Sequence, residues 1–340
     1  MSFLIVRLGS LGDLIHTLPA VAALRRAHPH ATIDWLVDAP HRGLLDLVPV
    51  ISSVIALEEP SARGWLAALR EMRRRHYTVA IDFQGLLKSA ALARLSGARQ
   101  VLGFSREGLR EPTARVFYTT GVQTPERIHV VRKNVVLAEA AGAAAGPLQF
   151  PIRDVPSPAL DELRARGVGR FALLNCGAAW PNKRWPAARF GQVAAWLRAA
   201  HGLSSVALWG PGEADLARDV VAASGGAAVA APTTDLSDLV AVARAADLVL
   251  SGDTGPTHIA AAVGTPVVAL FGPTDPARNG PWDPADIVLS RYSACRCHYR
   301  RACRLDAATW CLGSIDEAAV RTAIGERLER VRRGTGHAPQ

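Results

Sequence analysis

Short apolar runs alternate with amphipathic stretches along the whole chain. In the first half the apolar runs predict strands at 3–8, 32–37, 54–57, 79–83 and 100–103. The stretches between and after them predict helices at 14–27, 41–47, 62–75, 86–95 and near 128–142. Strands that alternate with helices in this way indicate a doubly wound parallel sheet.

The alternation resumes after 141–158, a stretch rich in Gly, Ala and Pro that is the best linker candidate. The second series predicts strands at 171–175, 206–209, 227–230, 247–250 and 267–271. Its predicted helices lie at 186–201, 213–223, 236–245, 258–263 and 315–333. We therefore expect Rossmann-like domains at 1–155 and 156–320, followed by a C-terminal helix and tail at 321–340.

Two such α/β domains that face each other across a cleft form the GT-B architecture of glycosyltransferases. The main alternative is a single Rossmann enzyme with an appended domain. No clean G-x-G-x-x-G follows the first predicted strand, which disfavours that alternative.

The stretch 247–276 predicts a strand, a tight loop, a short helix and another strand. Asp253, Thr254 and Gly255 form the loop, and Pro256 suits the first helical position because it lacks an N–H. A loop that leads into a helix N-terminus presents N–H groups to an anion, at the sheet edge where α/β proteins bind ligands. An ordinary turn capped by Asp253 and Thr254 is the plainer interpretation.

The composition limits the classes of binding partner that the protein can have. The chain has 340 residues, 49% of them hydrophobic, a net charge of +9 and a pI near 9.9. No apolar run reaches the roughly 18 residues of a membrane span. Arg7 and Asp13 interrupt the first apolar stretch, so we expect no signal peptide and a cytoplasmic protein. No nucleic-acid-binding motif is evident, so the basic surplus favours an anionic membrane face or a phosphorylated substrate.

Three residues at predicted strand ends are candidates for chemistry. Asp13 either caps the first helix or acts as a general base, although a helix N-terminus favours its ionised form and so weakens a base. Lys183 is one of only three lysines, with Lys88 and Lys133, and suits a diphosphate, unless it is an ordinary surface lysine. Glu213 either accepts ribose hydroxyls or is a favourable first-turn acid.

A cysteine cluster stands near the C-terminus, beside several arginines that include Arg304. Its members are Cys295, Cys297, Cys303 and Cys311. The spacing C-x-C-x5-C-x7-C lacks the paired C-x2-C elements of common zinc sites, and cytoplasmic disulfides are disfavoured. A metal site, a disulfide and reduced thiols all remain open.

The sequence resembles the ADP-heptose:lipopolysaccharide heptosyltransferases, glycosyltransferase family 9, over nearly its whole length. The segments that carry the resemblance, in part to the heptosyltransferase I branch, are 5–19, 81–89, 110–112, 183–186, 210–213 and 253–258. The last of them is the most specific. In contrast to that branch, Gly177-Ala178-Ala179 replaces a threonine pair, and the cysteine cluster resembles other members of the family.

The resemblance implies an inverting, metal-independent transferase that needs no cofactor. It implies transfer of heptose from ADP-heptose to the Kdo-lipid A inner core, at the cytoplasmic face of the inner membrane and with peripheral attachment. Asp13 is then the base. The implied donor-binding residues, in the C-terminal domain, are Lys183, Glu213, Asp253, Thr254, Gly255 and His258. The implied acceptor-binding residues, in the N-terminal domain, are Lys88, Arg110 and Arg63.

Other functions fit the same frame. Another family 9 transferase would use a different acceptor, as heptosyltransferase II does. A nucleotide-sugar epimerase or hydrolase would turn the donor over without a lipid acceptor. A nucleotide-sugar binding protein would tolerate the loss of Asp13.

Overall fold

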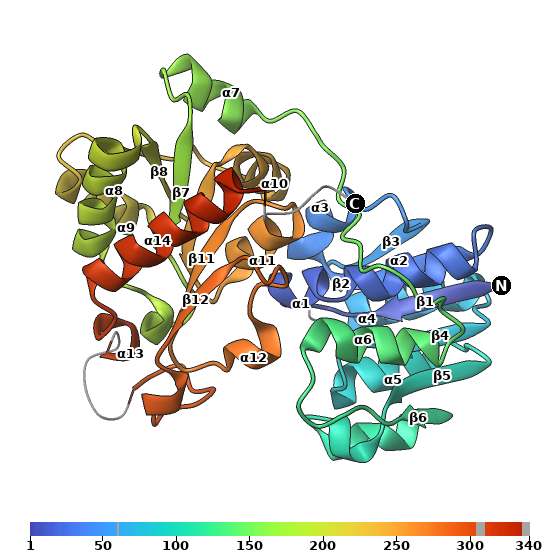
Figure 1. Ribbon diagram of the computed structural model, residues 1–340. Coiled ribbons are helices and arrows are strands. Elements are labelled where there is room, and N and C mark those ends of the chain that lie inside the picture. The colour runs from blue at the N-terminus through green and yellow to red at the C-terminus, as the bar shows by residue number, and fades with distance from the viewer. Residues whose placement is uncertain (60, 304–309, 335–340) are drawn as a thin grey trace. The chain divides into compact units, whose positions relative to one another are not determined.

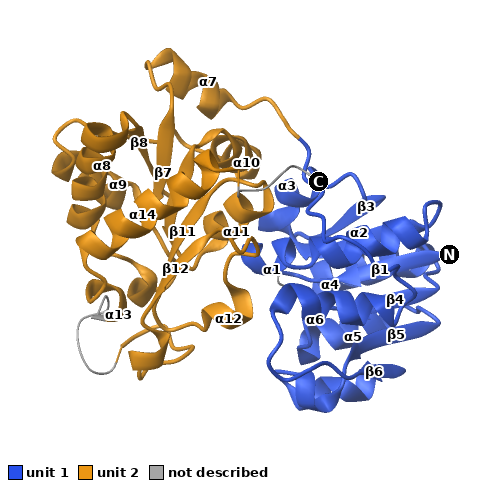
Figure 2. Cartoon of the chain, viewed as in Figure 1, with its two compact units in different colours: residues 1–153 blue, residues 154–340 orange. Residues whose placement is uncertain are grey.

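The computed structural model describes residues 1–59, 61–303 and 310–334. The chain forms two compact units, residues 1–153 and 154–340, which Figure 2 colours separately. Each unit contains one six-stranded parallel sheet with helices packed around it (Figure 1).

The sheet of the first unit has the order β3-β2-β1-β4-β5-β6. Its strands are β1 (Ser2–Val6), β2 (Thr32–Asp38), β3 (Ser53–Leu57), β4 (Val79–Asp82), β5 (Gln100–Phe104) and β6 (Thr120–Val122). Its α-helices are α1 (Leu11–Ile15), α2 (Leu18–Ala27), α3 (Arg42–Leu45), α4 (Ala62–Arg74), α5 (Leu87–Leu95) and α6 (Val130–Glu139). Short 3-10 helices are η1 (Ala39–His41), η2 (Arg106–Gly108) and η3 (Pro112–Phe117).

The sheet of the second unit has the order β12-β11-β10-β7-β8-β9. Its strands are β7 (Phe171–Asn175), β8 (Ser204–Leu208), β9 (Ala228–Ala230), β10 (Leu248–Gly252), β11 (Val267–Phe271) and β12 (Ile287–Ser290). The longer helices are α7 (Pro158–Ala165), α8 (Ala187–His201), α9 (Ala214–Ala223), α10 (Leu236–Ala245), α11 (Gly255–Ala262) and α14 (Glu317–Arg332). The short ones are η4 (Pro181–Lys183), α12 (Pro276–Asn279), η5 (Tyr292–Ala294) and α13 (Trp310–Gly313).

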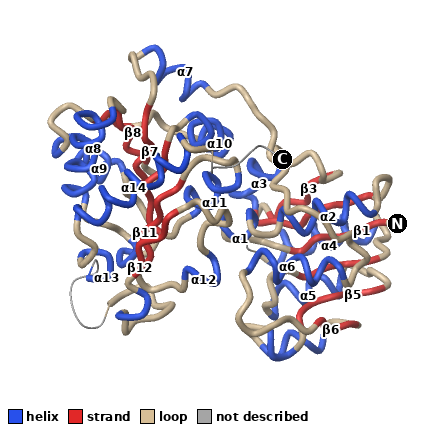
Figure 3. The backbone as a smooth tube through the Cα atoms, viewed as in Figure 1, coloured by secondary structure: helices blue, strands red, loops and turns tan. Residues whose placement is uncertain are grey.

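The central strands are buried on both faces, as the near-continuous apolar runs of the sequence predict. Every residue of β7, β10 and β11 is buried, because helices cover both faces of a doubly wound sheet (Figure 3). Helix α14 belongs to the second unit and packs its buried Val320 and Ile324 into the same core.

Several predicted elements are wrong in detail. The predicted helix at 14–27 is two helices, because Pro19 cannot continue a helix from the preceding turn and lies instead near the start of α2. Helix α11 starts at Gly255, three residues earlier than expected, so Pro256 is its second residue. The strands β6 and β12 were not predicted, since both are edge strands of three and four residues that are half exposed.

Each sheet has one switch point, where the chain turns from building one side of the sheet to building the other. In the first unit it lies between β1 and β4, and in the second between β7 and β10. All strands are parallel, so the loops that follow these pairs emerge at the same sheet edge. This is the edge at which open α/β sheets bind their ligands.

Candidate active site

Asp13 lies at the switch point of the first unit, in the first turn of α1. Its Oδ1 is 2.5 Å from Arg7 Nη2, and its Oδ2 accepts hydrogen bonds from the backbone N–H and the hydroxyl of Ser10, both at 3.1 Å. The side chain of Asp13 is 36% exposed, whereas that of Arg7 is 9% exposed. Asp13 therefore caps α1 and still presents part of its carboxylate to solvent.

The loop after β4 fixes the loop that carries Asp13. Gln84 Oε1 accepts a hydrogen bond from the Leu8 N–H at 2.8 Å, and the Arg7 guanidinium donates to the carbonyl oxygen of Phe83. Arg7 thus joins Asp13 to the neighbouring strand end. The Phe83 carbonyl orients the Arg7 guanidinium, and Arg7 together with the Ser10 N–H orients the carboxylate of Asp13.

Asp82, at the end of β4, is fully buried. Tyr118 donates to its Oδ2 at 2.7 Å and Ser89 at 2.9 Å, while the Gln84 N–H donates to its Oδ1 at 2.9 Å. Burial raises the pKa of Asp82 above its usual value, against the lowering effect of these hydrogen bonds. All these contacts order the loop from within, so Asp82 has a structural role.

The structure brings the three predicted acceptor residues to one region of the first unit. Lys88, on α5, lies with its ammonium 5.8 Å above the Trp65 ring of α4, two residues beyond Arg63. Glu111, next to Arg110, accepts a hydrogen bond from the N–H of Leu87 at 2.7 Å. Arg63, Lys88 and Arg110 are all exposed, and they follow β3, β4 and β5 respectively.

Lys183 and Asp253 meet at the switch point of the second unit, one after β7 and the other after β10. Lys183 Nζ is 2.5 Å from Asp253 Oδ2 and donates also to the Asp253 carbonyl oxygen at 3.1 Å. The ammonium lies 4.8 Å from the centre of the Trp180 ring. Its side chain is 15% exposed, because a buried carboxylate and an indole hold it, so the alternative of an ordinary surface lysine is wrong.

Asp253 is surrounded by donors. Thr274 donates to its Oδ2 at 2.6 Å, Asn279 donates to its Oδ1 at 3.0 Å, and His258 Nε2 lies 3.2 Å from its Oδ1. Burial by itself would raise the pKa of Asp253, but the hydrogen bond from His258 and the charge of Lys183 hold this pKa well below its usual range. Asp253 is therefore a buried anion that positions Lys183 and His258.

Thr254 and Gly255 form the start of α11 beside this ion pair. The Thr254 hydroxyl turns inward, where Asn175 Nδ2 donates to it at 2.8 Å and to Ser251 Oγ at 2.9 Å. Thr257 donates to the same Ser251 oxygen at 2.7 Å. These contacts fix the N-terminus of α11, whose first N–H groups have no partner within the helix and carry its positive dipole end.

Glu213 lies at the end of the neighbouring strand β8, just ahead of α9. Its Oε2 accepts from the Gly210 N–H at 3.1 Å, and its Oε1 is 3.3 Å from Arg184 Nη2. A Cβ at Gly177 would collide with this carboxylate. The absence of a side chain at Gly177 therefore makes room for Glu213.

Consecutive residues link these groups. Lys183 pairs with Asp253, and Arg184 pairs with Glu213, so η4 and the residue after it connect the loops of β10 and β8. Sequence reasoning missed Arg184, Asn175 and Arg7. The signal available was position, since Arg7 and Asn175 adjoin the ends of β1 and β7, and Arg184 directly follows Lys183.

Three of the four predicted cysteines are together. Cys295, Cys297 and Cys311 are buried, with Sγ atoms of each pair 3.2 to 3.7 Å apart, and the partly buried Cys303 packs against them. All are free thiols. Arg304, which the sequence places beside the cluster, lies outside the described residues.

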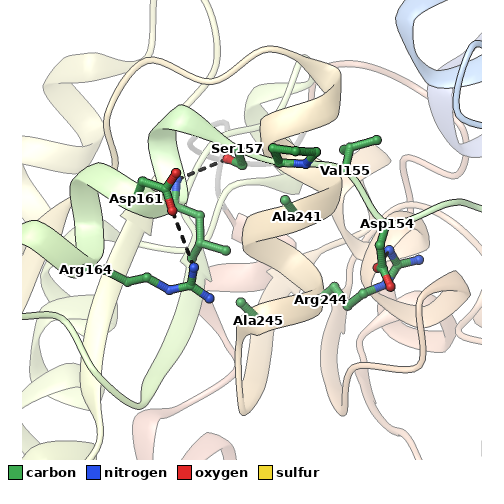
Figure 4. Close-up of a pocket in the computed structure, with 10 residues that line it drawn as sticks. Asp154, Val155, Ser157, Asp161, Arg164, Ala241, Arg244 and Ala245 are labelled. Carbon is green, nitrogen blue, oxygen red and sulfur yellow. Dashed lines mark hydrogen bonds and ion pairs between the residues drawn. The ribbon is translucent and has the colours of Figure 1, made fainter.

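A separate pocket of about 340 Å³ occurs between α7 and α10 (Figure 4). Arg164 pairs with Asp161 at 3.4 Å on one side of it, and Arg244 pairs with Asp154 on the other. The C-terminal ends of α7 and α10 lead into the amino ends of β7 and β10. The pocket is therefore distinct from the carboxyl-edge site.

Comparison with known proteins identifies the family. A family model described as glycosyltransferase family 9 (heptosyltransferase) matches residues 65–309. Lipopolysaccharide heptosyltransferase 1 of Pseudomonas aeruginosa is 30% identical over 314 residues, which cover 89% of this chain and 87% of that enzyme. The chain belongs to glycosyltransferase family 9. The predicted family and the predicted glycosyltransferase activity are thereby confirmed.

Solved structures of heptosyltransferases match nearly the whole chain. E. coli heptosyltransferase WaaC with ADP aligns with a TM-score of 0.75 and 26% identity, covering 97% of this chain and 99% of that one. A structure of WaaC with ADP-2-deoxy-2-fluoro heptose aligns with the same TM-score and identity, over 96% and 99%. E. coli ADP-heptose lps heptosyltransferase II, at 20% identity and a TM-score of 0.79 over 98% and 100%, supports the fold alone. The GT-B fold is confirmed.

Among the described residues, no helix has both the length and the apolar character needed to cross a membrane.

Proposed function

We propose that the protein is an inverting heptosyltransferase that transfers heptose from ADP-heptose to the Kdo-lipid A inner core of lipopolysaccharide. Membership of family 9 and the similarity to heptosyltransferase 1 support the reaction class. The observation that carries the proposal is the Lys183–Asp253 pair beside the N-terminus of α11. It provides a fixed cation and helix-end N–H groups for the diphosphate of a leaving ADP.

On this proposal the second unit holds the donor. Lys183 and the first N–H groups of α11, at Thr254 and Gly255, bind the diphosphate. The carboxylate of Asp253 already accepts hydrogen bonds from four protein donors. Asp253, together with His258, therefore positions these diphosphate-binding groups. Glu213 accepts hydrogen bonds from the ribose hydroxyls, and Arg184 keeps it oriented.

The first unit supplies the base and holds the acceptor. Asp13 takes the proton of the acceptor hydroxyl, and the oxygen attacks the anomeric carbon on the face opposite the ADP. The new C–O bond forms as the bond to the diphosphate oxygen breaks, so the configuration inverts. Lys183 and the α11 dipole neutralise the charge that develops on the leaving oxygen, so the step needs no metal. Arg63, Lys88 and Arg110 bind the anionic groups of the lipid, with the protein attached peripherally at the cytoplasmic face of the membrane.

The test is Asp13→Asn, assayed with ADP-heptose and Kdo-lipid A by ADP release and by the mass of the product. Asparagine still accepts the Ser10 hydrogen bond but cannot take a proton, so transfer should fall by roughly 10²- to 10⁴-fold. Donor affinity by calorimetry should be nearly unchanged, and the melting temperature should fall by only a few degrees, since Asp13 is 36% exposed and the buried Arg7 keeps its hydrogen bond to the Phe83 carbonyl.

A matched control is Asp46→Asn, which removes an exposed carboxylate paired with Arg42 in the same unit. It should transfer at the wild-type rate. If Asp13→Asn retains more than about a tenth of wild-type transfer, Asp13 is only a helix cap. Substitution of the lipid by other core acceptors distinguishes heptosyltransferase I from another family 9 activity. Donor turnover in the absence of any acceptor would indicate a hydrolase or an epimerase.

A further inference from the structure

The buried cysteine cluster has the geometry of a metal site. Among the described residues, Cys295, Cys297 and Cys311 each offer one sulfur, and the three sulfurs lie within 4.8 Å of one another. Their separations are 3.2 Å for 295–297, 3.2 Å for 295–311 and 3.7 Å for 297–311. A tetrahedral ion with metal–sulfur bonds of about 2.3 Å places its sulfurs about 3.8 Å apart, close to this triangle.

A purely apolar packing of thiols does not explain this convergence. The three side chains are at most 4% exposed and come from two segments of the chain, yet their sulfurs lie within 4.8 Å of one another. A disulfide joins two sulfurs at about 2.05 Å and would leave the third thiol facing the bond. One ion uses all three sulfurs at once.

The surroundings offer a candidate fourth ligand and compensating charge. Cys303 is partly buried and packs against the cluster, so it can complete a tetrahedron. A divalent ion with four thiolates carries excess negative charge. The exposed Arg296, Arg300 and Arg301 of the same segment offset this charge.

We propose that Cys295, Cys297 and Cys311, with Cys303, bind one divalent transition-metal ion, zinc or iron, in a structural site. Thiolate ligands and tetrahedral geometry select these metals over magnesium or calcium. Binding releases the thiol protons and forms four metal–sulfur bonds, with no change of oxidation state. The site is separate from the proposed diphosphate site, which uses Lys183.

The segment that holds the ion braces the loops around Lys183. Asn182, the neighbour of Lys183, is fully buried, donates to the Arg300 carbonyl at 2.8 Å, and has its amide nitrogen 3.9 Å from Cys297 Sγ. The Tyr299 N–H donates to the Pro273 carbonyl at 2.9 Å, next to the Thr274 that binds Asp253. Loss of the ion should therefore loosen both sides of the Lys183–Asp253 pair.

The first test is elemental analysis of the full chain, purified without a histidine tag. Zinc and iron together should amount to about one equivalent per chain, and Cys297→Ser and Cys311→Ser should each reduce this at least several-fold. Cys176→Ser is the control, since this buried thiol donates to the Leu208 carbonyl, outside the cluster. It should retain the metal. Cys303→Ser should weaken retention during dialysis against a chelator, as expected of a fourth ligand.

A second test does not depend on the folding of variants. Wild-type protein is stripped by a thiol reagent and a chelator, re-reduced, and titrated with cobalt(II) alone. Thiolate-to-cobalt charge-transfer absorption and the d–d bands of tetrahedral cobalt should saturate at one equivalent, and zinc should displace them. The proposal is wrong if the purified protein is metal-free and gives no such bands. It is also wrong if the non-reduced intact mass reveals a disulfide within the cluster.

Discussion

Removal of the Lys183 side chain should affect both the stability of the fold and the rate of the reaction. In the wild type the ammonium faces Asp253, whose side chain is only 4% exposed. Lys183→Ala leaves this carboxylate buried without its cation. The variant should therefore be both less stable and less active, and the two effects have different causes.

The size of the stability loss follows from the burial of the pair. Breaking a buried ion pair costs about 3–5 kcal/mol, and the donors Thr274, Asn279 and His258 that remain on Asp253 favour the lower end. A loss of about 3 kcal/mol lowers the melting temperature by roughly 6–12 °C for a unit of this size. The loss of leaving-group stabilisation, about 2–4 kcal/mol, lowers turnover by about 30- to 1,000-fold.

The double variant Lys183→Ala/Asp253→Asn separates the two effects. Asparagine removes the uncompensated charge, so stability should return to within about 1 kcal/mol of wild type. Turnover should stay low, because no cation faces the diphosphate. Arg170→Ala is the matched control: it breaks an ion pair to Asp247 in the same unit, but Arg170 is 74% exposed, so the loss should stay below about 1 kcal/mol.

Urea unfolding measures the free energies of the variants, and ADP release at saturating acceptor measures turnover. Recovery of both stability and turnover in the double variant would refute the proposed role, since Lys183 would then serve only to neutralise Asp253. A single variant as stable as wild type would refute the inference that the pair is held in a low-dielectric environment.

Other predictions concern the remaining charges. Glu213→Gln should raise the donor KM by about 10-fold with little change in kcat, because a hydrogen bond to a charged group is lost on binding; an unchanged KM would rule out a ribose contact. Added Mg²⁺ or Mn²⁺, after brief treatment with a mild chelator, should leave the transfer rate unchanged, and a rate that depends on either ion would contradict leaving-group stabilisation by Lys183. The folded-state pKa of Asp253 is lowered, so its contribution to stability is present above its unfolded pKa of about 3.9 and is lost below it. The unfolding free energy of wild type, relative to the double variant, should accordingly decline below about pH 4, and a difference independent of pH would contradict this. Arg63→Ala or Lys88→Ala should raise the KM for the lipid acceptor more at low than at high salt, with donor binding as the unaffected control.

Periodicity predicted most of the fold because the central strands are apolar throughout. The buried strands β7, β10 and β11 contain almost only aliphatic and small residues, which leave little ambiguity. The edge strands β6 and β12 lack this signal, since each covers few residues and is partly exposed. Tertiary pairing with a neighbouring strand, which no local pattern records, determines that they are strands.

The sequence allowed the positions of the main site residues to be predicted, but not the residues that they contact. Strand ends and the rarity of lysine pointed to Asp13, Lys183 and Glu213. The environment of Asp253 could not be predicted, because Thr274 and Asn279 follow it by 21 and 26 residues and come from the segment after β11. Whether a lysine is a surface cation or half of a buried pair depends on such distant contacts.

On the proposed function, the pairing of Lys183 with Asp253 has two opposing consequences for the binding and reaction of an anionic donor. The carboxylate weakens the positive potential that the diphosphate meets, which by itself disfavours binding. It also fixes the ammonium beside α11, so little reorganisation is needed as charge develops on the leaving oxygen. The hydrogen bonds to Asp253 from Thr274 and Asn279, and the contacts of the cysteine segment behind Asn182, make the arrangement rigid. Since catalysis depends on stabilising the transition state more than the bound donor, a weaker but fixed cation is the better catalyst.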